Sequence, residues 1–261
     1  MKDCLEKVDL KNLSPSELEG FIASFGKERY RSIQLLRWLF KIGVHRFDEM
    51  TNLSKMFRQE LSRISLISSL SPLQVEKSED GTQKFLFELE DGNRIESVLI
   101  PEKKRLTLCL STQAGCAMGC RFCLTGKMGL KRSLTTAEIL NQILAVRETL
   151  PDNMSITNIV LMGMGEPLAN YENILKAIGL MTHPEAFKFS SRRVTLSTVG
   201  LVPELEQLAK EITRFRLAIS LNASDEETRS RLMPINRRHP LKKLLELCRK
   251  FPLPPRARIT F

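Results

Sequence analysis

The sequence predicts an α/β fold in which parallel strands curl into a partial, open β/α barrel with helices on its outside. From residue 105 onwards, strand-like and helix-like segments alternate, and repeated β-then-α units require a parallel sheet covered by helices. The strands also carry two unlike faces, and the last strand ends the chain without a helix to cover it. The predicted strands are 106–112, 158–163, 192–199, 214–222 and 257–261.

The two faces of these strands favour a barrel over a doubly wound sheet. In "LTLCLST" the three leucines share one face, whereas Thr107, Cys109 and Ser111 share the other. In "RLAISLN" the apolar face likewise opposes Ser220 and Asn222. A sheet with helices on both sides is apolar on both faces. One apolar face and one face of small polar residues instead indicate helices outside and a ligand-filled interior.

The helices between the strands are predicted from their apolar spacing, and the first follows a Thr135–Glu138 capping box. They are 136–150, 171–181, 203–212 and 241–251. The fifth strand stops at Phe261, and an uncovered strand exposes apolar surface and a free edge. We therefore expect the chain to be a truncated version of a longer protein. A partner chain that covers the gap is the alternative.

Two smaller regions are predicted before the barrel, which takes residues 105–261. Residues 1–68 are expected to form a helical accessory domain, because "SPSELEGFIASFG" begins with Ser14 as N-cap and Glu17 three residues later. Two more helical patterns, "RYRSIQLLRWLFKIG" and "TNLSKMFRQELSRI", follow it. Residues 69–104 are predicted to form a β-hairpin extension, because alternating residues flank the turn pair Asp91-Gly92.

The charge of the chain points to a nucleic-acid partner. The net charge is +10, and the basic residues gather in three runs, at 27–46, 103–132 and 229–258. Each run alone can be solvated surface, but three in one chain favour RNA or DNA. No apolar run approaches the ~20 residues of a membrane span, and the N-terminus lacks the apolar segment of a signal peptide. A cytoplasmic monomer with reduced thiols is expected.

The stretch "CAMGCRFC" places Cys116, Cys120 and Cys123 within eight residues, directly after the first barrel strand. A disulfide is disfavoured in a reducing compartment and leaves one cysteine over. A zinc site needs four ligands, so a distant Cys or His would have to complete it. Three thiolates fit a [4Fe–4S] cluster better, because they leave one iron open for the amino and carboxylate groups of S-adenosylmethionine (SAM).

This motif resembles the signature of the radical-SAM superfamily. Further stretches are similar to one family within it, the dual-specificity RNA adenine-C2 methyltransferases of the RlmN/Cfr type. They are "FDEMTNLSK", "TLCLSTQAGCAMGCRFCLTG", "VLMGMGEPLAN", "RRVTLSTVG" and "AISLNASDEETRSRLMPINRR". The resemblance runs from about residue 20 to the last residue. It implies a radical-SAM enzyme that methylates C2 of an adenosine in 23S rRNA and in tRNA.

The resemblance also implies which residues contact SAM. An acidic side chain at position 166 suits the methionine ammonium group. The implied contacts are Gly165, Glu166, Ser197, Ser220, Leu221 and Asn222. Strand alternation independently puts Ser197, Ser220 and Asn222 on the inward face. Many relatives carry His at the position of Asn222. For the two serines, small residues that only fill the barrel remain the alternative.

The chemistry implied by the resemblance is indirect, because C2 of adenine is electron-poor and does not attack a sulfonium methyl group. A cysteine near the C-terminus is methylated first. A 5′-deoxyadenosyl radical then takes hydrogen from that methyl group, and the carbon radical adds to C2. Glu96 matches the residue that accepts the C2 proton. Cys109 matches the cysteine that resolves the protein–RNA link through a disulfide, with a buried small residue as its alternative.

The methyl-carrying cysteine has no match in this sequence. Cys248 falls on the apolar face of its predicted helix, and Cys4 lies in a terminus expected to fray. We therefore expect this polypeptide to be inactive by itself. The resemblance further implies an electron donor such as flavodoxin or ferredoxin. Alternatives are a noncatalytic RNA-binding scaffold, C8 methylation of RNA, or another radical-SAM reaction on a peptide or cofactor.

Overall fold

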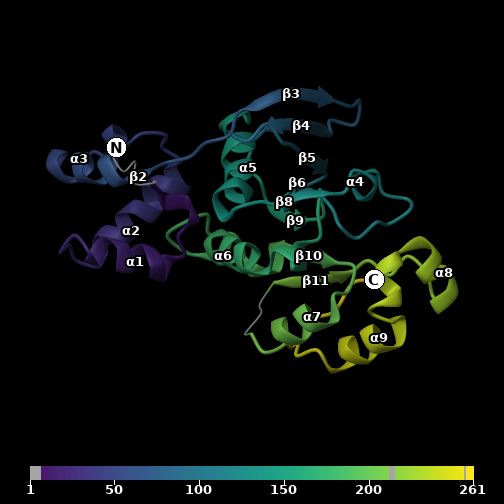
Figure 1. The fold of residues 1–261 in the computed structure, drawn as a ribbon. Helices are drawn as coiled ribbons and strands as arrows, with labels where there is room; N and C mark the ends of the chain where they lie inside the picture. Colours follow the sequence, from purple (N-terminus) through teal and green to yellow (C-terminus); the bar gives the residue numbers. More distant parts are fainter. Residues whose placement is uncertain (1–6, 212–214, 256) are drawn as a thin grey trace, which may run out of the picture.

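A seven-stranded mixed sheet forms the centre of the computed structural model, which describes residues 7–211, 215–255 and 257–261 (Figure 1). Its strand order is β11-β10-β9-β6-β5-β4-β3. The four parallel strands are β6 (Arg105–Cys109), β9 (Asn158–Leu161), β10 (Val194–Thr198) and β11 (Arg216–Ile219). The predicted α/β class with a parallel-rich, open sheet is therefore observed.

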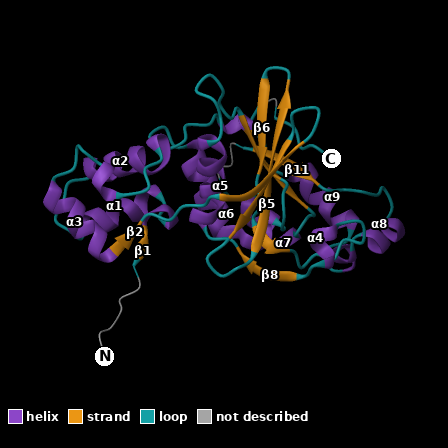
Figure 2. Ribbon diagram, turned by 90° about the horizontal axis from the view of Figure 1, so that it is seen from above, coloured by secondary structure: helices purple, strands orange, loops and turns teal. Residues whose placement is uncertain are grey.

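Helices follow each parallel strand and cover one face of the sheet (Figure 2). They are α5 (Thr136–Glu148), α6 (Tyr171–Thr182), α7 (Val202–Leu208) and α9 (Leu241–Lys250), whereas α8 (Glu226–Leu232) lies beyond the ends of the strands (Figure 1). The leucines of β6 are buried, whereas Thr107 and Cys109 on the opposite face are only partly covered. This alternation is the one that the sequence predicted. None of the described helices is long and apolar enough to cross a membrane.

The strands are shorter than predicted at their carboxyl ends. β6 ends at Cys109. The N–H of Leu110 still bonds to the carbonyl of Val160 on β9, whereas the N–H of Thr112 bonds to the carbonyl of Met164 in the loop after β9. The fifth predicted strand contributes a single parallel bridge, between Thr260 and Ala218. Parts of the predicted segments 203–212 and 214–222 lie outside the described residues, as does Cys4.

The predicted hairpin forms, and it belongs to the main sheet. The antiparallel strands β3 (Pro72–Lys77), β4 (Gln83–Glu88) and β5 (Arg94–Glu102) extend the sheet beyond β6. At the β4–β5 turn, Asp91 accepts a hydrogen bond from the backbone N–H of Asn93, at 3.1 Å, and Gly92 has a φ of 78°. This left-handed conformation suits glycine, and it explains why the Asp-Gly pair predicts the turn.

The N-terminal helices are α1 (Pro15–Ala23), α2 (Tyr30–Leu36) and α3 (Lys55–Ile64). Ser14 and Glu17 form the predicted capping box of α1. Helix α2 continues as a π-helical segment, Arg37–Ile42, which the sequence did not predict. A short parallel pair, β1 (Val8–Asp9) and β2 (Ser65–Leu66), closes this region beside the helices, away from β11 (Figure 1).

A buried lysine fastens the N-terminal region to the barrel. The ammonium group of Lys11 donates to the carbonyl of Ser68 at 2.8 Å and to the side chain of Asn141 on α5 at 2.9 Å. Asn12 accepts a hydrogen bond from the backbone N–H of Ala137, also on α5. Lys11 is 1% exposed, and this burial lowers its pKa to about 8. Nothing in the local sequence pattern indicates this contact.

A buried arginine ties together the carboxyl ends of two neighbouring strands. Arg229 of α8 is fully buried, and its guanidinium donates to the carbonyl of Val199, after β10, at 2.7 Å. It also donates to the carbonyl of Leu221, after β11, at 3.2 Å, and to the side chain of Asn236. Asn236 in turn donates to Glu226 at 2.7 Å. The segment "MPIN" therefore serves to position this arginine.

Lys11→Met is expected to remove a pH dependence of stability. The pKa of Lys11 is about 8 when folded but near 10.5 when exposed, so the unfolded chain binds more protons between these values. The free energy of unfolding of the wild type should therefore rise from about pH 8 to about pH 10, relative to Lys11→Met, by up to about 3 kcal/mol. Urea denaturation at both pH values measures this. A difference that stays constant with pH contradicts it, and Lys7→Met is the exposed control.

Arg229→Leu is expected to lower the free energy of unfolding by about 3 kcal/mol, because it leaves buried carbonyl groups and Asn236 without their donor. Arg231→Leu, an exposed change on the same helix, should alter it by less than about 0.5 kcal/mol. Urea denaturation of both variants measures the effect. Equal stability of the two variants would show that the buried guanidinium does not hold the strand ends.

Candidate functional site

The three clustered cysteines lie on one loop at the carboxyl ends of the parallel strands. Cys116 and Cys120 are buried and Cys123 is partly buried. The loop leaves the short strand β7 (Gln113–Gly115) and enters α4 (Leu124–Lys127). β7 pairs with β8 (Leu130–Ser133), and the N–H of Arg121 bonds to the carbonyl of Leu232 at the end of α8. Both ends of the cysteine loop are therefore fixed.

The surroundings of the cysteine loop disfavour charged thiols. Burial, with smaller contributions from the charges of Cys116 and Cys123, raises the pKa of Cys120 to about 11. Burial also raises the pKa of Cys116, with smaller contributions from Glu166 and Cys123. These thiols lose their protons readily only when a positive group binds them, as metal ions do. The charge of Cys123 contributes to the raised pKa of both Cys116 and Cys120.

The donor set fits an iron–sulfur cluster. Three thiols on one short loop, two of them buried, are the ligand type that such clusters take. Among the residues that the structure describes, no three His, Cys, Asp or Glu side chains are placed to share one metal ion. Cysteines that hold different irons of a cluster do not need to meet at a single ion. All five described cysteines are free thiols.

The loop after β9 packs closely against the segment that leads to the cysteines. A Cβ atom on Gly163 would lie 2.7 Å from the carbonyl of Leu110, and one on Gly165 would lie 2.6 Å from Gln113. Gly165 also has a φ of 104°, which strains any other residue. The N–H of Glu166 donates to the side chain of Gln113 at 2.9 Å. This close approach requires both glycines of "MGMGEP".

The carboxyl group of Glu166 is turned into the protein. It is 2% exposed and accepts hydrogen bonds from the N–H of Leu168 at 3.1 Å and of Val199 at 2.9 Å. Burial raises the pKa of Glu166 to about 7, although these hydrogen bonds and one from Thr198 act against it. The sequence suggested a carboxylate facing a ligand ammonium. In the structure both oxygens instead bind the backbone, and the carboxyl links the loop after β9 to the end of β10.

The predicted serines meet at the ends of β10 and β11. The hydroxyl oxygens of Ser197 and Ser220 are 3.4 Å apart. The carbonyl of Leu221 accepts from Arg229, so this residue has only its N–H and side chain left for a ligand. Asn222 has a φ of 58°, and its amide nitrogen lies 3.3 Å from the sulfur of Met233. These positions lie at the same ends of the strands as the cysteine loop.

Cys109 and Glu96 share the inward face of the sheet. Cys109 pairs with Val98 on β5 and with Val160 on β9, and burial raises its pKa to about 11. Glu96 precedes Val98 by two residues on β5, so its side chain lies on the same face. It forms an ion pair of 3.3 Å with Lys84 and remains 42% exposed. The structure therefore brings the two predicted catalytic residues onto one surface.

Buried amides that the sequence analysis missed also position the site. The side chain of Gln142, on α5, accepts hydrogen bonds from Ser97 at 2.7 Å and from the N–H of Ser111 at 2.9 Å, and it donates to the carbonyl of Ser111. Asn170 donates to the carbonyls of Thr112 and Leu134. The polar pair Asn141-Gln142 within the otherwise apolar stretch "ILNQILAV" was the available signal for Gln142.

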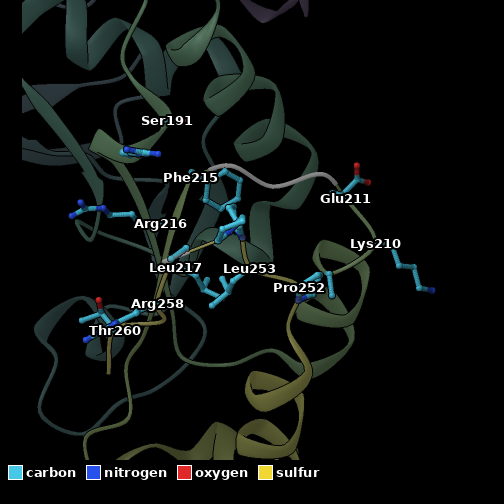
Figure 3. A pocket seen from close by; sticks show the side chains of 15 residues that line it. Ser191, Lys210, Glu211, Phe215, Arg216, Leu217, Pro252, Leu253, Arg258 and Thr260 are labelled. Atoms are coloured by element: carbon cyan, nitrogen blue, oxygen red, sulfur yellow. The ribbon is translucent and has the colours of Figure 1, made fainter.

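A large cavity lies elsewhere in the molecule, and none of the predicted site residues lines it (Figure 3). Its volume is about 1050 Å³, and Phe215, Leu217 and Leu253 supply its apolar wall. Phe215 and Leu217 lie at the start of β11, whereas Ser220 lies just beyond the end of that strand. The cavity is therefore at the opposite strand ends from the cysteine loop.

Comparisons with known proteins agree with this arrangement. Residues 8–67 match the ribosomal RNA large subunit methyltransferase N-terminal domain, and residues 110–252 match the radical SAM superfamily. A crystal structure of a radical SAM methyltransferase from Sphaerobacter thermophilus is similar with a TM-score of 0.86 and 41% identity, over 94% of this chain and 72% of that chain. Proteins of this superfamily use a [4Fe–4S] cluster and SAM.

Curated relatives are similar along nearly the whole chain. The dual-specificity RNA methyltransferase RlmN of Geotalea uraniireducens is 56% identical over 256 residues, which are 98% of this chain and 73% of the relative. That of Geobacter sulfurreducens is 54% identical over 253 residues, 97% of this chain and 69% of the relative. The chain therefore belongs to the RlmN family of dual-specificity RNA methyltransferases, within the radical SAM superfamily.

Proposed function

We propose that this chain carries the radical-SAM centre of an enzyme that methylates C2 of an adenosine in 23S rRNA and in tRNA. The observation that carries the proposal is the placement of three thiols on one fixed loop at the strand ends, with Cys109 on the inward face of the strand that leads to it. The similarity to RlmN relatives over 98% of the chain supports the RNA substrates. Such substrates are met in the cytoplasm.

In the proposed site, Cys116, Cys120 and Cys123 hold the cluster. When bound, the cluster supplies the electron that cleaves a carbon–sulfur bond of SAM. The loop buries the first two thiols, so water has little access to the sulfur ligands. The electron comes to this loop from a carrier such as flavodoxin or ferredoxin, and we propose that the protein acts as a monomer.

The proposed SAM contacts divide into backbone and side-chain groups. Because the Glu166 carboxyl is already satisfied, Gly165 and Glu166 contribute backbone groups. The paired hydroxyls of Ser197 and Ser220 can each donate and accept, and they suit the polar groups of the cofactor. Leu221 contributes its N–H or side chain, and Asn222 its amide, from the loop that Arg229 holds.

The proposed catalytic residues act from the inward face. Burial raises the pKa of Cys109 to about 11, so this residue keeps its proton at neutral pH. It therefore remains a thiol until it resolves the protein–RNA link. Glu96 is partly exposed and forms an ion pair with Lys84. A carboxyl group on this face can accept a proton from a base held above it. A base must leave its stack to reach this face, as unpaired loop nucleotides can.

The experiment that tests the function is anaerobic reconstitution with iron and sulfide, followed by incubation with SAM, a reductant and RNA. About four irons per chain and release of 5′-deoxyadenosine are expected. Because the methyl-carrying cysteine has no match in this sequence, mass spectrometry of RNA nucleosides against 2-methyladenosine and 8-methyladenosine standards is expected to show neither product. RNA binding without iron uptake or SAM cleavage would indicate a scaffold and would overturn the proposal.

Cys120→Ala is expected to prevent cluster assembly, because it removes one of three thiolates that the chain offers. Loss of a residue that only supports a metal ligand costs 10–100-fold, so loss of the ligand itself should reduce SAM cleavage by at least about 100-fold. Cys248→Ala, on α9, is the matched control and should retain iron and cleavage. Iron and sulfide content and 5′-deoxyadenosine yield are the measurements. Full iron content in Cys120→Ala contradicts the assignment.

A further inference from the structure

A second basic feature lies where the parallel strands begin. Lys104 and Arg105 stand at the start of β6, Arg192 and Arg193 immediately precede β10, and Arg216 is the first residue of β11. These five residues come from three segments that are far apart in the sequence. We call them the basic edge. In the sequence they appear as scattered cations, and only the parallel sheet brings them together.

The basic edge lines a cavity of about 280 Å³. The other lining residues are Thr157, Asn158 and Ser190, which are neutral and polar, and no carboxylate is among the described lining residues. None of the five cations forms an ion pair with another described residue. Cations that are packed together without a counterion repel one another, and binding of an anion relieves this repulsion.

The positive surface continues into the large neighbouring cavity. Arg192 and Arg216 line both cavities, and Arg258 lines the large one on the side of Arg216. Figure 3 shows the guanidinium of Arg216 turned away from the apolar group formed by Phe215 and Leu253. The cations are therefore spread along the edge of the sheet and are not gathered around one point. Such a row suits a chain of anions better than a single ion.

The chemistry of the lining selects phosphate groups. The planar guanidinium group of arginine can donate two parallel hydrogen bonds to a phosphate. Four of the five cations of the basic edge are arginines. The cavity is smaller than the 300–1,000 Å³ typical of sites that enclose a small molecule. No aromatic side chain is among its described lining residues on which a base could stack. The basic edge therefore fits backbone phosphates.

We propose that the basic edge is a second RNA contact, which binds backbone phosphates of the substrate away from the adenosine that reacts. The inference rests on the proposed RNA substrate. The edge is at the amino ends of the strands, whereas the cysteine loop is at their carboxyl ends, so an electron carrier docked here would be far from the cluster. Phosphate contacts carry no sequence information, so one edge serves two unrelated RNAs.

The test compares the salt dependence of tRNA binding by the whole chain. The triple variant Arg192→Ala, Arg193→Ala, Arg216→Ala removes three cations of the basic edge. The matched control Lys77→Ala, Arg94→Ala, Lys188→Ala removes three exposed cations that lie outside the basic runs and the N-terminal helical domain. Fluorescence anisotropy of a full-length tRNA transcript, titrated at several salt concentrations from about 50 to about 200 mM, gives the slope of log K against log salt for each protein.

The edge variant is expected to lose two to three units of this slope, because each lost phosphate contact lowers it by about one unit. Its Kd should rise by on the order of 10- to 100-fold at the lower salt concentration, whereas the control should change its slope by less than about one unit.

A second variant guards against a folding defect. Lys104→Ala, Arg105→Ala removes cations from the opposite side of the same cavity and should lower the slope by one to two units. If the edge variants and the control have equal slopes of log K against log salt while the wild type binds tRNA tightly, this inference is wrong and the proposed function is unaffected. Failure of the wild type to bind tRNA overturns the proposed function as well. Thermal stabilisation by inorganic phosphate with unchanged tRNA binding shows a free-anion site and also overturns it.

Discussion

The site depends on hydrogen bonds between buried polar side chains and backbone groups at the ends of the strands. An open sheet lacks the continuous ladder that fixes strand ends in a closed barrel. Here Arg229 joins the ends of β10 and β11, and Glu166 joins the loop after β9 to the end of β10. Gln142 holds the start of the segment that leads to the cysteines. Each buried group is costly to leave unpaired, so each linkage fixes one arrangement.

The same burial sets the electrostatics of the site. The low-polarity surroundings raise the pKa values of Cys116, Cys120 and Glu166, so the apo site disfavours negative charge. A cationic metal cluster reverses this balance when thiolates bind it. Burial lowers the pKa of Arg229, and the charges of Glu226 and Cys120 act against this. Binding of the cluster and order in the surrounding loops are therefore linked.

The two ends of the parallel strands differ in chemistry. The carboxyl ends carry thiols, hydroxyls and closely packed glycines, which suit a cofactor and a single reacting base. The amino ends carry arginines and lysines without carboxylates, which suit an RNA backbone. This separation gives a large RNA a point of attachment away from the reacting base. Positioning and reaction then depend on different residues.

The sequence by itself determined the features that short-range patterns encode. The spacing of Cys116, Cys120 and Cys123 defines a ligand set, alternation placed Cys109 on the inward face, and Ser14 and Asp91 marked a helix start and a turn. Each depends on residues only a few positions apart, where backbone geometry repeats with a fixed period.

Only the tertiary structure decided the roles that depend on distant partners. Arg229 belonged to a basic run that could be solvated surface, and Glu166 was predicted only as a SAM contact. Each is buried because its hydrogen-bond partners come from other strand ends. The π-helical end of α2, the single-bridge fifth strand and the basic edge depend on such contacts as well. No local period records which segments become neighbours, because sheet order and loop packing are set by the burial of the whole chain.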